Sequence, residues 1–496
     1  MNGWILIPVF LPVIAGIFLL LASAREHQGK PAFDKTVSFT GTILVISAVL
    51  AVTAAWTGEK SVTLFYLMDN LPVYFHIDGV SRIFVTFTSI VWVCAGFYAF
   101  VYMKHEGEEN RFFGFYLLTY GVLAALDFSG NLVTMYFFYE LMTLASAPMV
   151  LHSGSREAIM AALKYLFFSL CGAYMGLFGI YFLYQNCNTL TFTPGGSLDP
   201  ALAQSHQGIL LIAVFAMLVG FGAKAGMFPL HAWLPAAHPV APSPASAVFS
   251  GVLVKSGVLA AIRAVYYVVG SDFIRGTWVQ TAWMVLTLLT VFMGSMMAYR
   301  EPVFKKRLAY STVSQVSYIL FGLSLLTPMG MTGALLHTVF HAFIKSALFL
   351  TAGVFIFECN KTKVGELTGI GKRMPKTLWF YTFASLALVG LPPASGFVSK
   401  WYLAEGALNA DVGVFGWLGP VVLLVSALLT AGYLLPVTMK GFFPGKEAGT
   451  DCGEAKKEPA ARMLVPLGIL SALTILLGIL PNPLIRYIGE LVSGLM

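Results

Sequence analysis

Segments that are apolar and long enough to cross a lipid bilayer follow one another along almost the whole chain. A membrane-spanning helix needs about 17 to 25 apolar residues, and segments that approach or exceed this length lie at 4–21, 36–56, 79–103 and 112–126. Ten more follow near 131–151, 160–184, 208–235, 244–269, 277–298, 307–326, 331–357, 377–410, 413–439 and 463–488. The pattern predicts an all-α integral membrane protein with about fourteen transmembrane helices, because a helix satisfies its own backbone groups in lipid.

The composition excludes a soluble globule and a chain with redox chemistry of its own. Hydrophobic residues make up 58% of the chain and charged residues only 11%, whereas soluble domains carry about 25% charged residues. The cysteines show no CxxC spacing, so we expect no iron–sulfur cluster, no metal site and no other cofactor. The first apolar segment lacks a basic leader and a small-residue cleavage site, so we expect it to remain as a span.

Basic residues are concentrated on alternate loops. If the N-terminus lies outside, the loops after odd-numbered spans hold most of the Lys and Arg, and the other loops hold little more than Lys60, Arg275 and Arg486. By the positive-inside rule the basic loops are cytoplasmic, so both termini are expected outside. The net charge of +7 therefore sets the topology and does not indicate a nucleic-acid partner. Lys305 and its two basic neighbours are expected on a solvated cytoplasmic rim.

Glycine and proline clusters interrupt two spans, the seventh at 220–229 and the twelfth at 390–396. Five spans separate the two breaks, which suggests repeats over spans 4–8 and 9–13, and an odd repeat length inverts the second copy in the membrane. The expected division of the chain is 1–111, with three helices and an external hairpin-like loop, 112–270, the first five-helix repeat, 271–440, the second and inverted repeat, and 441–496, a charged cytoplasmic loop and helix 14. Broken helices at matching places in two halves point to a transport path.

Several charged and titratable residues remain inside the apolar spans once the loops are set aside. They are Arg82, Glu140, Lys164, Lys224, Lys255, Arg263, His337, His341, Lys345 and Lys400. Each charge at mid-bilayer costs about 2.5 to 3.5 kcal/mol on insertion scales, so keeping this many requires pairing, hydration or function. We interpret Arg82 and Arg263, with Asp78, as interfacial anchors or helix-packing partners.

Glu140 lies near the middle of span five, and Lys224 lies just before the break in span seven. A carboxylate that moves a few ångströms toward or away from a buried lysine can load or unload the lysine's proton. The two residues are therefore the candidate coupling pair. The alternative is a static buried ion pair that fixes helix register.

Lysine and histidine residues extend this candidate path on both sides of the first break. Lys164 and Lys255 flank the broken helix, and burial readily tunes the proton affinity of lysine; the alternative is that both extend toward an interface. His337, His341 and Lys345 repeat every four residues and so share one helix face, about 6 Å apart. Histidine titrates near neutral pH, which suits a proton ladder. A zinc site also uses such a spacing, but no Cys, Asp or Glu nearby completes one.

Lys400 follows the second break and ends this series of titratable groups, so it is the expected exit. His231 and His238 lie just beyond the first break. They can feed or receive protons, or they can cap the loop structurally.

Four motifs resemble one known family. They are Gly222-Ala-Lys-Ala-Gly-Met-Phe-Pro-Leu-His-Ala-Trp-Leu-Pro-Ala-Ala-His-Pro-Val-Ala-Pro-Ser-Pro-Ala-Ser-Ala247, Lys255-Ser-Gly, Phe-Tyr-Glu140-Leu and Leu-Ala-Tyr-Ser-Thr-Val-Ser-Gln315. They are similar to motifs of the antiporter-like subunits of respiratory complex I, Mrp-type sodium/proton antiporters and group 4 membrane-bound hydrogenases. The resemblance covers nearly the whole chain.

The resemblance implies a fourteen-helix fold with inverted five-helix repeats, in a prokaryotic cytoplasmic membrane. It implies roles for Glu140 and Lys224 as the coupled pair, Lys164 and Lys255 as relay groups, His337 and His341 as the connection, and Lys400 as the terminal group. It also implies other membrane subunits as partners, including related antiporter-like chains, together with a peripheral iron–sulfur or hydrogenase arm.

Three features show how the chain compares with particular members of this family. Ala236 stands where relatives commonly carry an acid. Lys400 is more similar to the Mrp and hydrogenase subunits than to complex I subunits with a glutamate there. The chain also lacks the long C-terminal helix of the largest complex I member.

The leading hypothesis is therefore an ion-translocating subunit, for H⁺ or Na⁺/H⁺, of a multisubunit complex. One alternative is a structural scaffold without translocation of its own, and Ala236 gives that idea slight support. Another is a stand-alone carrier for an organic solute, which needs a roomy binding pocket at the midplane. The leading hypothesis requires the buried lysines, Glu140 and the histidines to form one continuous hydrated line.

Overall fold

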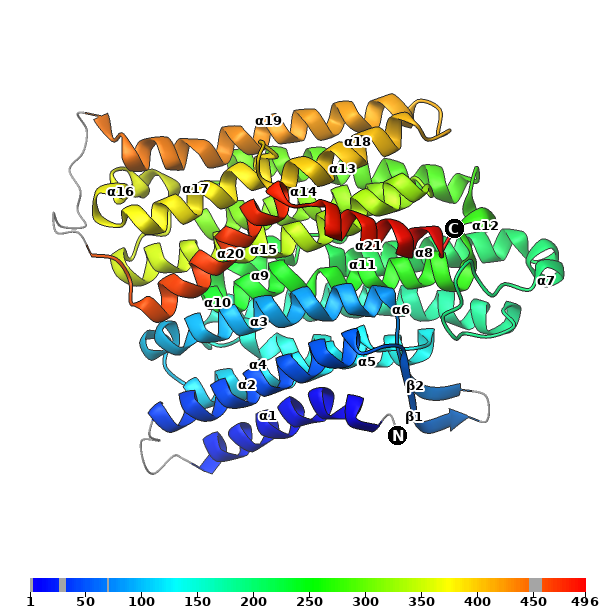
Figure 1. Ribbon diagram of the computed structural model, residues 1–496, viewed down its shortest axis with the longest axis horizontal. Coiled ribbons are helices and arrows are strands. Elements are labelled where there is room, and N and C mark those ends of the chain that lie inside the picture. The colour runs from blue at the N-terminus through cyan, green and yellow to red at the C-terminus, as the bar shows by residue number, and fades with distance from the viewer. Residues whose placement is uncertain (1–2, 26–32, 69–70, 446–456) are drawn as a thin grey trace.

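A computed structural model of the chain describes residues 3–25, 33–68, 71–445 and 457–496. Cys452 and the centre of the charged 440–462 loop lie outside the described residues. The helices run along the long axis of the molecule, and both termini lie at the same end (Figure 1).

The N-terminal part of the bundle holds a short η1 turn (Gly3–Leu6) and the helices α1 (Ile7–Arg25), α2 (Phe33–Trp56) and α3 (Gly79–Glu106). Between α2 and α3 the chain forms an antiparallel hairpin of β1 (Lys60–Met68) and β2 (Leu71–Ile77), in which Lys60 pairs with Ile77. The hairpin lies at the same end of the bundle as the two termini (Figure 1).

The next part of the chain contains α4 (Glu109–Asp127), α5 (Leu132–Val150), α6 (Arg156–Asn186), α7 (Pro200–Ser205), α8 (Gln207–Ala225) and α9 (Leu234–Val240). It continues with α10 (Ser243–Val248), η2 (Phe249–Leu253), α11 (Lys255–Ile262) and η3 (Arg263–Val269). The last four form one buried helical rod in which η2 and η3 are π-helical.

The C-terminal part contains α12 (Ser271–Ile274), α13 (Trp278–Arg300), α14 (Phe304–Ser324), α15 (Pro328–Cys359), η4 (Val364–Leu367) and α16 (Ile370–Arg373). It ends with α17 (Pro375–Val389), α18 (Ser395–Leu408), α19 (Phe415–Phe442), α20 (Ala461–Ile479) and α21 (Asn482–Ser493). The continuous span expected at 463–488 is divided, because the chain leaves the helix at Leu480 and Pro481.

Local sequence explains where the helices start and where two of them break. Side chains of Asp78, Asn131 and Ser155 accept hydrogen bonds from the first turns of α3, α5 and α6, as N-capping residues do. At the breaks, α8 ends at Gly226 (φ +81°) and α17 ends at Gly390 (φ +92°). Glycine is favoured there because it adopts the left-handed conformation without a Cβ clash.

Ten of the described helical segments are long and apolar enough to cross a membrane. The helices α4, α5 and α14 and the broken pair α17 and α18 fall outside that criterion. The chain is therefore a helical membrane protein, as expected, while the number of fourteen spans stays a prediction.

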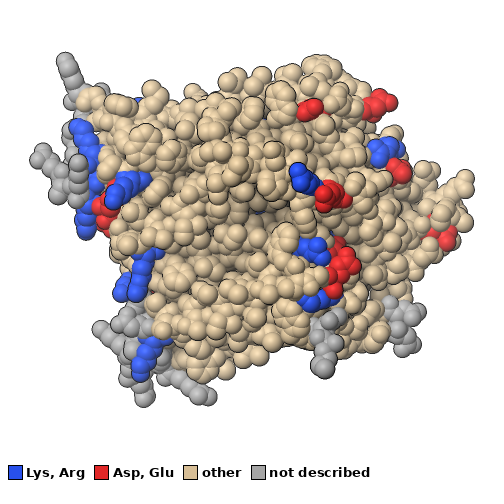
Figure 2. All heavy atoms as spheres, in the orientation of Figure 1, with Lys and Arg blue, Asp and Glu red and all other residues tan. Residues whose placement is uncertain are grey.

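Charge separates the two ends of the bundle. On the face drawn in Figure 2, a broad belt without Lys, Arg, Asp or Glu separates mainly basic side chains at the end opposite the termini from basic and acidic side chains together at the other end. This is the arrangement that the alternating loops of the sequence predict.

A buried ion pair ties α3 to the buried rod. The Arg263 guanidinium, with a side chain 2% exposed, binds both oxygens of Asp78 in a bidentate pair, with Nη2 2.8 Å from Oδ1. Asp78 also caps α3 through Ser81. The expectation that Arg263 and Asp78 are helix-packing partners agrees with this contact.

Replacing Asp78 with Asn should destabilise the protein by about 3 to 5 kcal/mol, because it leaves a buried guanidinium without its anion. Asn preserves the helix cap, so the charge alone is tested. The control is Asp272→Asn, which removes the exposed Arg275–Asp272 pair and should cost at most about 1 kcal/mol. Thermal unfolding of the purified protein in detergent measures both; equal shifts would contradict the prediction.

Candidate functional site

The candidate residues lie on helices that pack against one another in sequence across the bundle. The contacts connect α5 to α6, α6 to α8, α8 to α11, α11 to α14, α14 to α15, and α15 to α18. Each of these helices contributes at least one titratable or hydroxyl side chain to the interior. The series therefore runs from one side of the bundle to the other, perpendicular to the helix axes.

Lys224 is fully buried at the end of α8 and is held by three hydroxyl groups. Its Nζ donates to Thr143 Oγ1 at 2.8 Å, to the Tyr165 hydroxyl at 2.7 Å and, more weakly, to Ser169 Oγ at 3.3 Å. The Tyr165 ring also lies beneath the ammonium group, 4.4 Å from it. All of these acceptors are neutral, so no fixed negative charge locks the lysine in its charged form.

The expected contact between Glu140 and Lys224 is not direct. Within the described residues, no carboxylate oxygen lies within 4 Å of the Lys224 ammonium. Glu140 is half-buried one helical turn before Thr143, its Oε1 has no hydrogen-bond partner, and it interacts with Lys224 only electrostatically. The hydroxyl of Thr143 occupies the place that the carboxylate was expected to take.

Lys164 does not lie inside the bundle. Its side chain is exposed on α6, beside the exposed Leu163 and Phe167, while the next residue, Tyr165, points inward to Lys224. The expectation of a buried relay at this position needs correction. Both faces of the α6 sequence are apolar there, so the sequence did not reveal which face points outward.

Lys255 is fully buried at the start of α11. Its Nζ donates to the backbone carbonyl of Ser250 at 2.6 Å. Ser250 lies in the π-helical segment η2, and such wide turns occur frequently at functional sites. The irregular backbone thus supplies the acceptor that a regular helix keeps for its own amides.

His337, His341 and Lys345 lie buried on one face of α15, as their spacing predicts. The two imidazole rings stack with centroids 5.8 Å apart. His337 Nδ1 lies 2.9 Å from Ser399 Oγ on α18, whereas both ring nitrogens of His341 lack a hydrogen-bond partner. Lys345 Nζ donates to the Leu308 carbonyl at 2.7 Å and to Ser311 Oγ at 2.6 Å.

Lys400 binds backbone carbonyls at the second helix break. Its Nζ donates to the carbonyls of Leu388 and Val389, at 2.7 and 3.0 Å, where α17 ends. These carbonyls are free because the helix stops, and the negative end of the helix dipole favours a cation there. A Cβ at Gly390 would lie 2.9 Å from Lys400 Cδ, so the glycine also leaves room for the lysine stem.

Tyr318 connects Lys400 to the histidines. The Lys400 ammonium lies 5.1 Å from the centre of the Tyr318 ring, and that ring stacks on His337 with centroids 5.6 Å apart. Tyr318 was not identified from the sequence.

His231 and His238 lie in different surroundings. His231 is half-buried in the turn after α8 and stacks on Phe228. His238 on α9 is 1% exposed, its Nε2 has no partner, and its ring stacks on Phe349 with centroids 4.5 Å apart.

Lys305 departs from its predicted position on a solvated rim. It is only 5% exposed, and its Nζ donates to backbone carbonyls of Pro239 and Ala241. A run of three basic residues at a helix start gave no sign that one of them turns inward.

Sequence reasoning also missed the hydroxyl groups that hold the lysines. Thr143, Tyr165, Ser169, Ser311 and Ser399 all contact candidate site residues. In α14, Ser311, Gln315 and Tyr318 repeat at helical spacing, but Thr312, Ser314 and Ser317 are polar as well, so the spacing does not single out Ser311.

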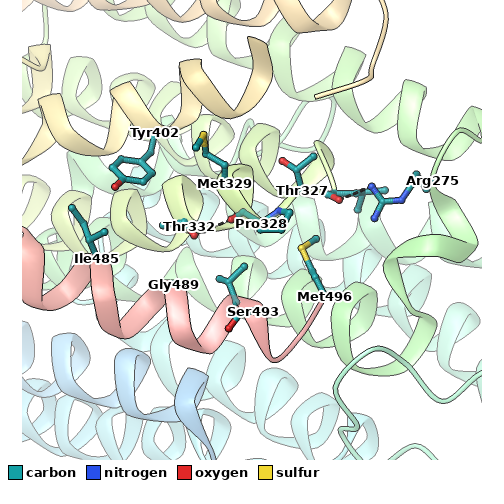
Figure 3. A pocket seen from close by; sticks show the side chains of 12 residues that line it. Arg275, Thr327, Pro328, Met329, Thr332, Tyr402, Ile485, Gly489, Ser493 and Met496 are labelled. Atoms are coloured by element: carbon teal, nitrogen blue, oxygen red, sulfur yellow. Dashed lines mark hydrogen bonds between the residues drawn. The ribbon is translucent and has the colours of Figure 1, made fainter. Parts of the chain in front are cut away.

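The bundle has a pocket at the end that carries the termini. The pocket has a volume of about 560 Å³ and lies between α15, α18 and α21 (Figure 3). Thr332 and Tyr402 line it; they lie on the same helices as His337 and Lys400, five and two residues away. His337 and Lys400 themselves do not line the pocket.

Comparisons with known proteins all match the chain to antiporter-like membrane proteins. A family model described as NADH:quinone oxidoreductase/Mrp antiporter, TM, matches residues 129–430, and one described as NADH-Ubiquinone oxidoreductase (complex I), chain 5 N-terminus, matches residues 67–113. The chain is 32% identical to NADH-quinone oxidoreductase subunit N of Desulforudis audaxviator over 89% of this chain and 91% of that protein. It is 28% identical to a Na(+)/H(+) antiporter protein of Alkalihalophilus pseudofirmus, over 98% and 96% of the two chains.

A solved structure shares the fold. A chain of the Mrp complex from Dietzia sp. DQ12-45-1b matches with a TM-score of 0.84 at 22% sequence identity, covering 100% of this chain and 97% of that one.

The hydroxyl groups of Thr143, Tyr165 and Ser169 that bind Lys224 form what we call the hydroxyl cradle. As long as Lys224 is present, this cradle should stabilise the folded protein. Hydrogen bonds to charged groups contribute about 1.5 to 3 kcal/mol each, so the double variant Thr143→Val/Tyr165→Phe should lose about 3 kcal/mol or more. Adding Lys224→Met should restore most of that loss, because no buried donor then lacks an acceptor. Thermal unfolding in detergent, followed by circular dichroism, measures the three variants.

The matched control is Thr338→Val, because that buried hydroxyl bonds only the Ala334 carbonyl of its own helix. It should cost about 1 kcal/mol. If the double variant were no less stable than this control, the cradle would not be what holds Lys224.

Proposed function

This chain belongs to the NADH:quinone oxidoreductase/Mrp antiporter family of membrane proteins, and we propose that it translocates H⁺, or H⁺ in exchange for Na⁺, as an antiporter-like subunit of a multisubunit membrane complex. The observation that carries the proposal is the series of buried amines, each bound by neutral oxygen atoms, together with the buried imidazoles of His337 and His341. Redox chemistry in partner chains of a respiratory complex, or an ion gradient in an Mrp-type antiporter, drives the transport.

The path runs from Glu140 and Lys224 through Lys255, His341 and His337 to Lys400, with Lys345 on the same helix as the histidines. Buried polar atoms nearly always have a partner, from protein or from ordered water. The partnerless atoms along this line, on Glu140, His337, His341 and Gln315, therefore support water molecules that join the groups into one path.

The two helix breaks support the division into repeats. We assign residues 112–270 and 271–440 to two inverted five-helix repeats, because each half contains one helix that stops in the bundle at a glycine. Lys224 lies in the last turn of the first broken helix, and Lys400 binds the last carbonyls of the second. The same electrostatic element, an amine at the negative end of a half-helix, thus occurs in both halves.

Orientation follows from the charge at the two ends. The mainly basic end in Figure 2 is assigned to the cytoplasm, and both termini to the outside of a prokaryotic cytoplasmic membrane. The pocket beside Thr332 and Tyr402 then opens outward, which makes it the exit vestibule beyond Lys400.

A partner chain covers the face of α5 and α6. Lys164 is exposed there and Glu140 is half-buried, among exposed apolar side chains such as Phe137 and Phe167. A charge facing lipid at this depth is costly, whereas a neighbouring membrane protein can pair with it. We therefore assign Lys164 to communication with a partner and not to the internal path.

A structural scaffold is the competing function. It requires Lys224 to stay charged and bonded to its three hydroxyl acceptors without releasing a proton. The absence of the acid at Ala236 points toward the scaffold. The two functions differ in what loss of Lys224 does to transport.

In proteoliposomes containing the whole complex, Lys224→Met should reduce ion translocation at least tenfold while the complex remains assembled, because a central proton carrier is gone. Proton movement is followed with a pH-sensitive dye, and sodium uptake is followed with an isotope. Measuring both in parallel separates H⁺ transport from Na⁺/H⁺ exchange. Lys372→Met, which removes an exposed charge on α16, should leave the rate within twofold. Unchanged transport by Lys224→Met would favour the scaffold.

A further inference from the structure

We propose that Glu106, Lys305 and His238 form a proton inlet that leads from the basic end of the molecule to Lys345. This inference rests on the proposed function and deepens it, since it names the route by which protons reach the internal path. The sequence suggested that His238 can feed or receive protons, whereas Lys305 was expected at the surface as one of three consecutive basic residues.

Lys305 differs sharply from the two basic residues that follow it. Lys306 pairs with Glu301 at 2.9 Å and is 39% exposed, and Arg307 donates to backbone carbonyls of Glu301 and Tyr433. Lys305 is buried, and within the described residues it has no carboxylate partner within 4 Å. Only neutral carbonyls of Pro239 and Ala241 receive its hydrogen bonds.

The position of Lys305 is also unfavourable for a permanent charge. It lies in the first turn of α14, where the helix dipole is positive and opposes a cation. Burial without a counter-ion adds to this cost. A lysine in such a place can release its proton at small cost, so the site suits transfer better than anchoring.

Glu106 connects Lys305 to the aqueous phase. It is exposed at the end of α3, and it is the acid that acts electrostatically on Lys305. Beside it, the Tyr102 hydroxyl accepts a hydrogen bond from Ser243 Oγ, at the start of α10. A surface carboxylate next to a buried amine can collect protons from water and pass them inward.

His238 connects Lys305 to the interior. It lies on α9, next to Pro239, whose carbonyl binds Lys305. Both Lys305 and Lys345 act on it electrostatically, and its Nε2 has no partner among the described residues. Phe349 contacts both His238 and Lys345, because its ring stacks on His238 and its centre lies 5.3 Å from the Lys345 ammonium.

The transfer balances without any further reactant. A proton moves from the Lys305 ammonium, through water, to the free Nε2 of neutral His238 and onward to Lys345. A proton collected by Glu106 then restores the ammonium of Lys305. Lys345 is a neutral amine when it accepts the proton from His238. Glu106, Lys305 and His238 return to their starting states, and the net result is one proton carried from the cytoplasmic surface to Lys345 on the internal path.

The test uses two substitutions of Lys305 in the whole complex, reconstituted in proteoliposomes. Lys305→Arg keeps the charge and the carbonyl contacts but cannot release a proton, so translocation should fall at least tenfold. Lys305→His keeps a titratable group and should transport several times faster than Lys305→Arg. The control Lys306→Arg changes the adjacent exposed lysine and should stay within twofold of wild type.

If Lys305→Arg translocated protons at the wild-type rate, the proposed inlet would be wrong, because a positive charge alone at this position would then be enough for translocation. Should Lys305→Arg fail to assemble, Glu106→Gln decides, since that exposed position tolerates substitution: a severalfold loss supports the inlet and an unchanged rate overturns it. Failure of the wild-type complex to translocate any ion would instead refute the proposed function, so the two failures are distinguishable.

Discussion

Burying an amine in an apolar bundle without a counter-ion is the physical constraint on which the interior of this protein depends. Lys224, Lys255, Lys345 and Lys400 each solve it with neutral oxygens, from hydroxyls or backbone carbonyls. Within the described residues, none of the four has a carboxylate within 4 Å. A hydroxyl can accept from an ammonium and can donate to a neutral amine, so such a cradle tolerates both protonation states. A close ion pair would hold the charged state alone.

Irregular backbone supplies many of these oxygens. The end of α17 offers two carbonyls to Lys400, and the π-helical η2 offers one to Lys255. A regular helix uses its carbonyls internally, so breaks and wide turns are the places where a carbonyl is most readily free for a cation. Lys345 shows that a regular helix can also contribute, because it binds the Leu308 carbonyl within α14. The glycines that cause the breaks are therefore part of the site's chemistry, and Gly390 lies directly against the lysine stem.

The sequence predicted the elements of this arrangement better than their contacts. Helical spans, the two breaks and the face shared by His337, His341 and Lys345 follow from hydropathy, glycine and the 3.6-residue period. Rotation about a helix axis does not follow when both faces are apolar, which is why Lys164 was placed inside. Nor does it follow within a run of three basic residues, which is why Lys305 was placed outside. Hydroxyl residues are common in such helices and mark no single face, so the cradle of Lys224 became visible only when α5, α6 and α8 were packed together.

The contrast between arginine and lysine inside the bundle separates transport from scaffolding. Arg263 cannot lose its proton at any accessible pH, and it is held by a bidentate carboxylate at the end of the bundle. That is how a charge is buried when its purpose is to stay. The central positions carry lysines instead, which can lose a proton, and they are surrounded by acceptors that do not fix the charge. A chain that needed only static charges for assembly could use arginine–carboxylate pairs throughout. Lysines bound by neutral oxygens instead occupy the central positions, at Lys224, Lys255, Lys345 and Lys400. Their use favours movement of protons over a purely structural role.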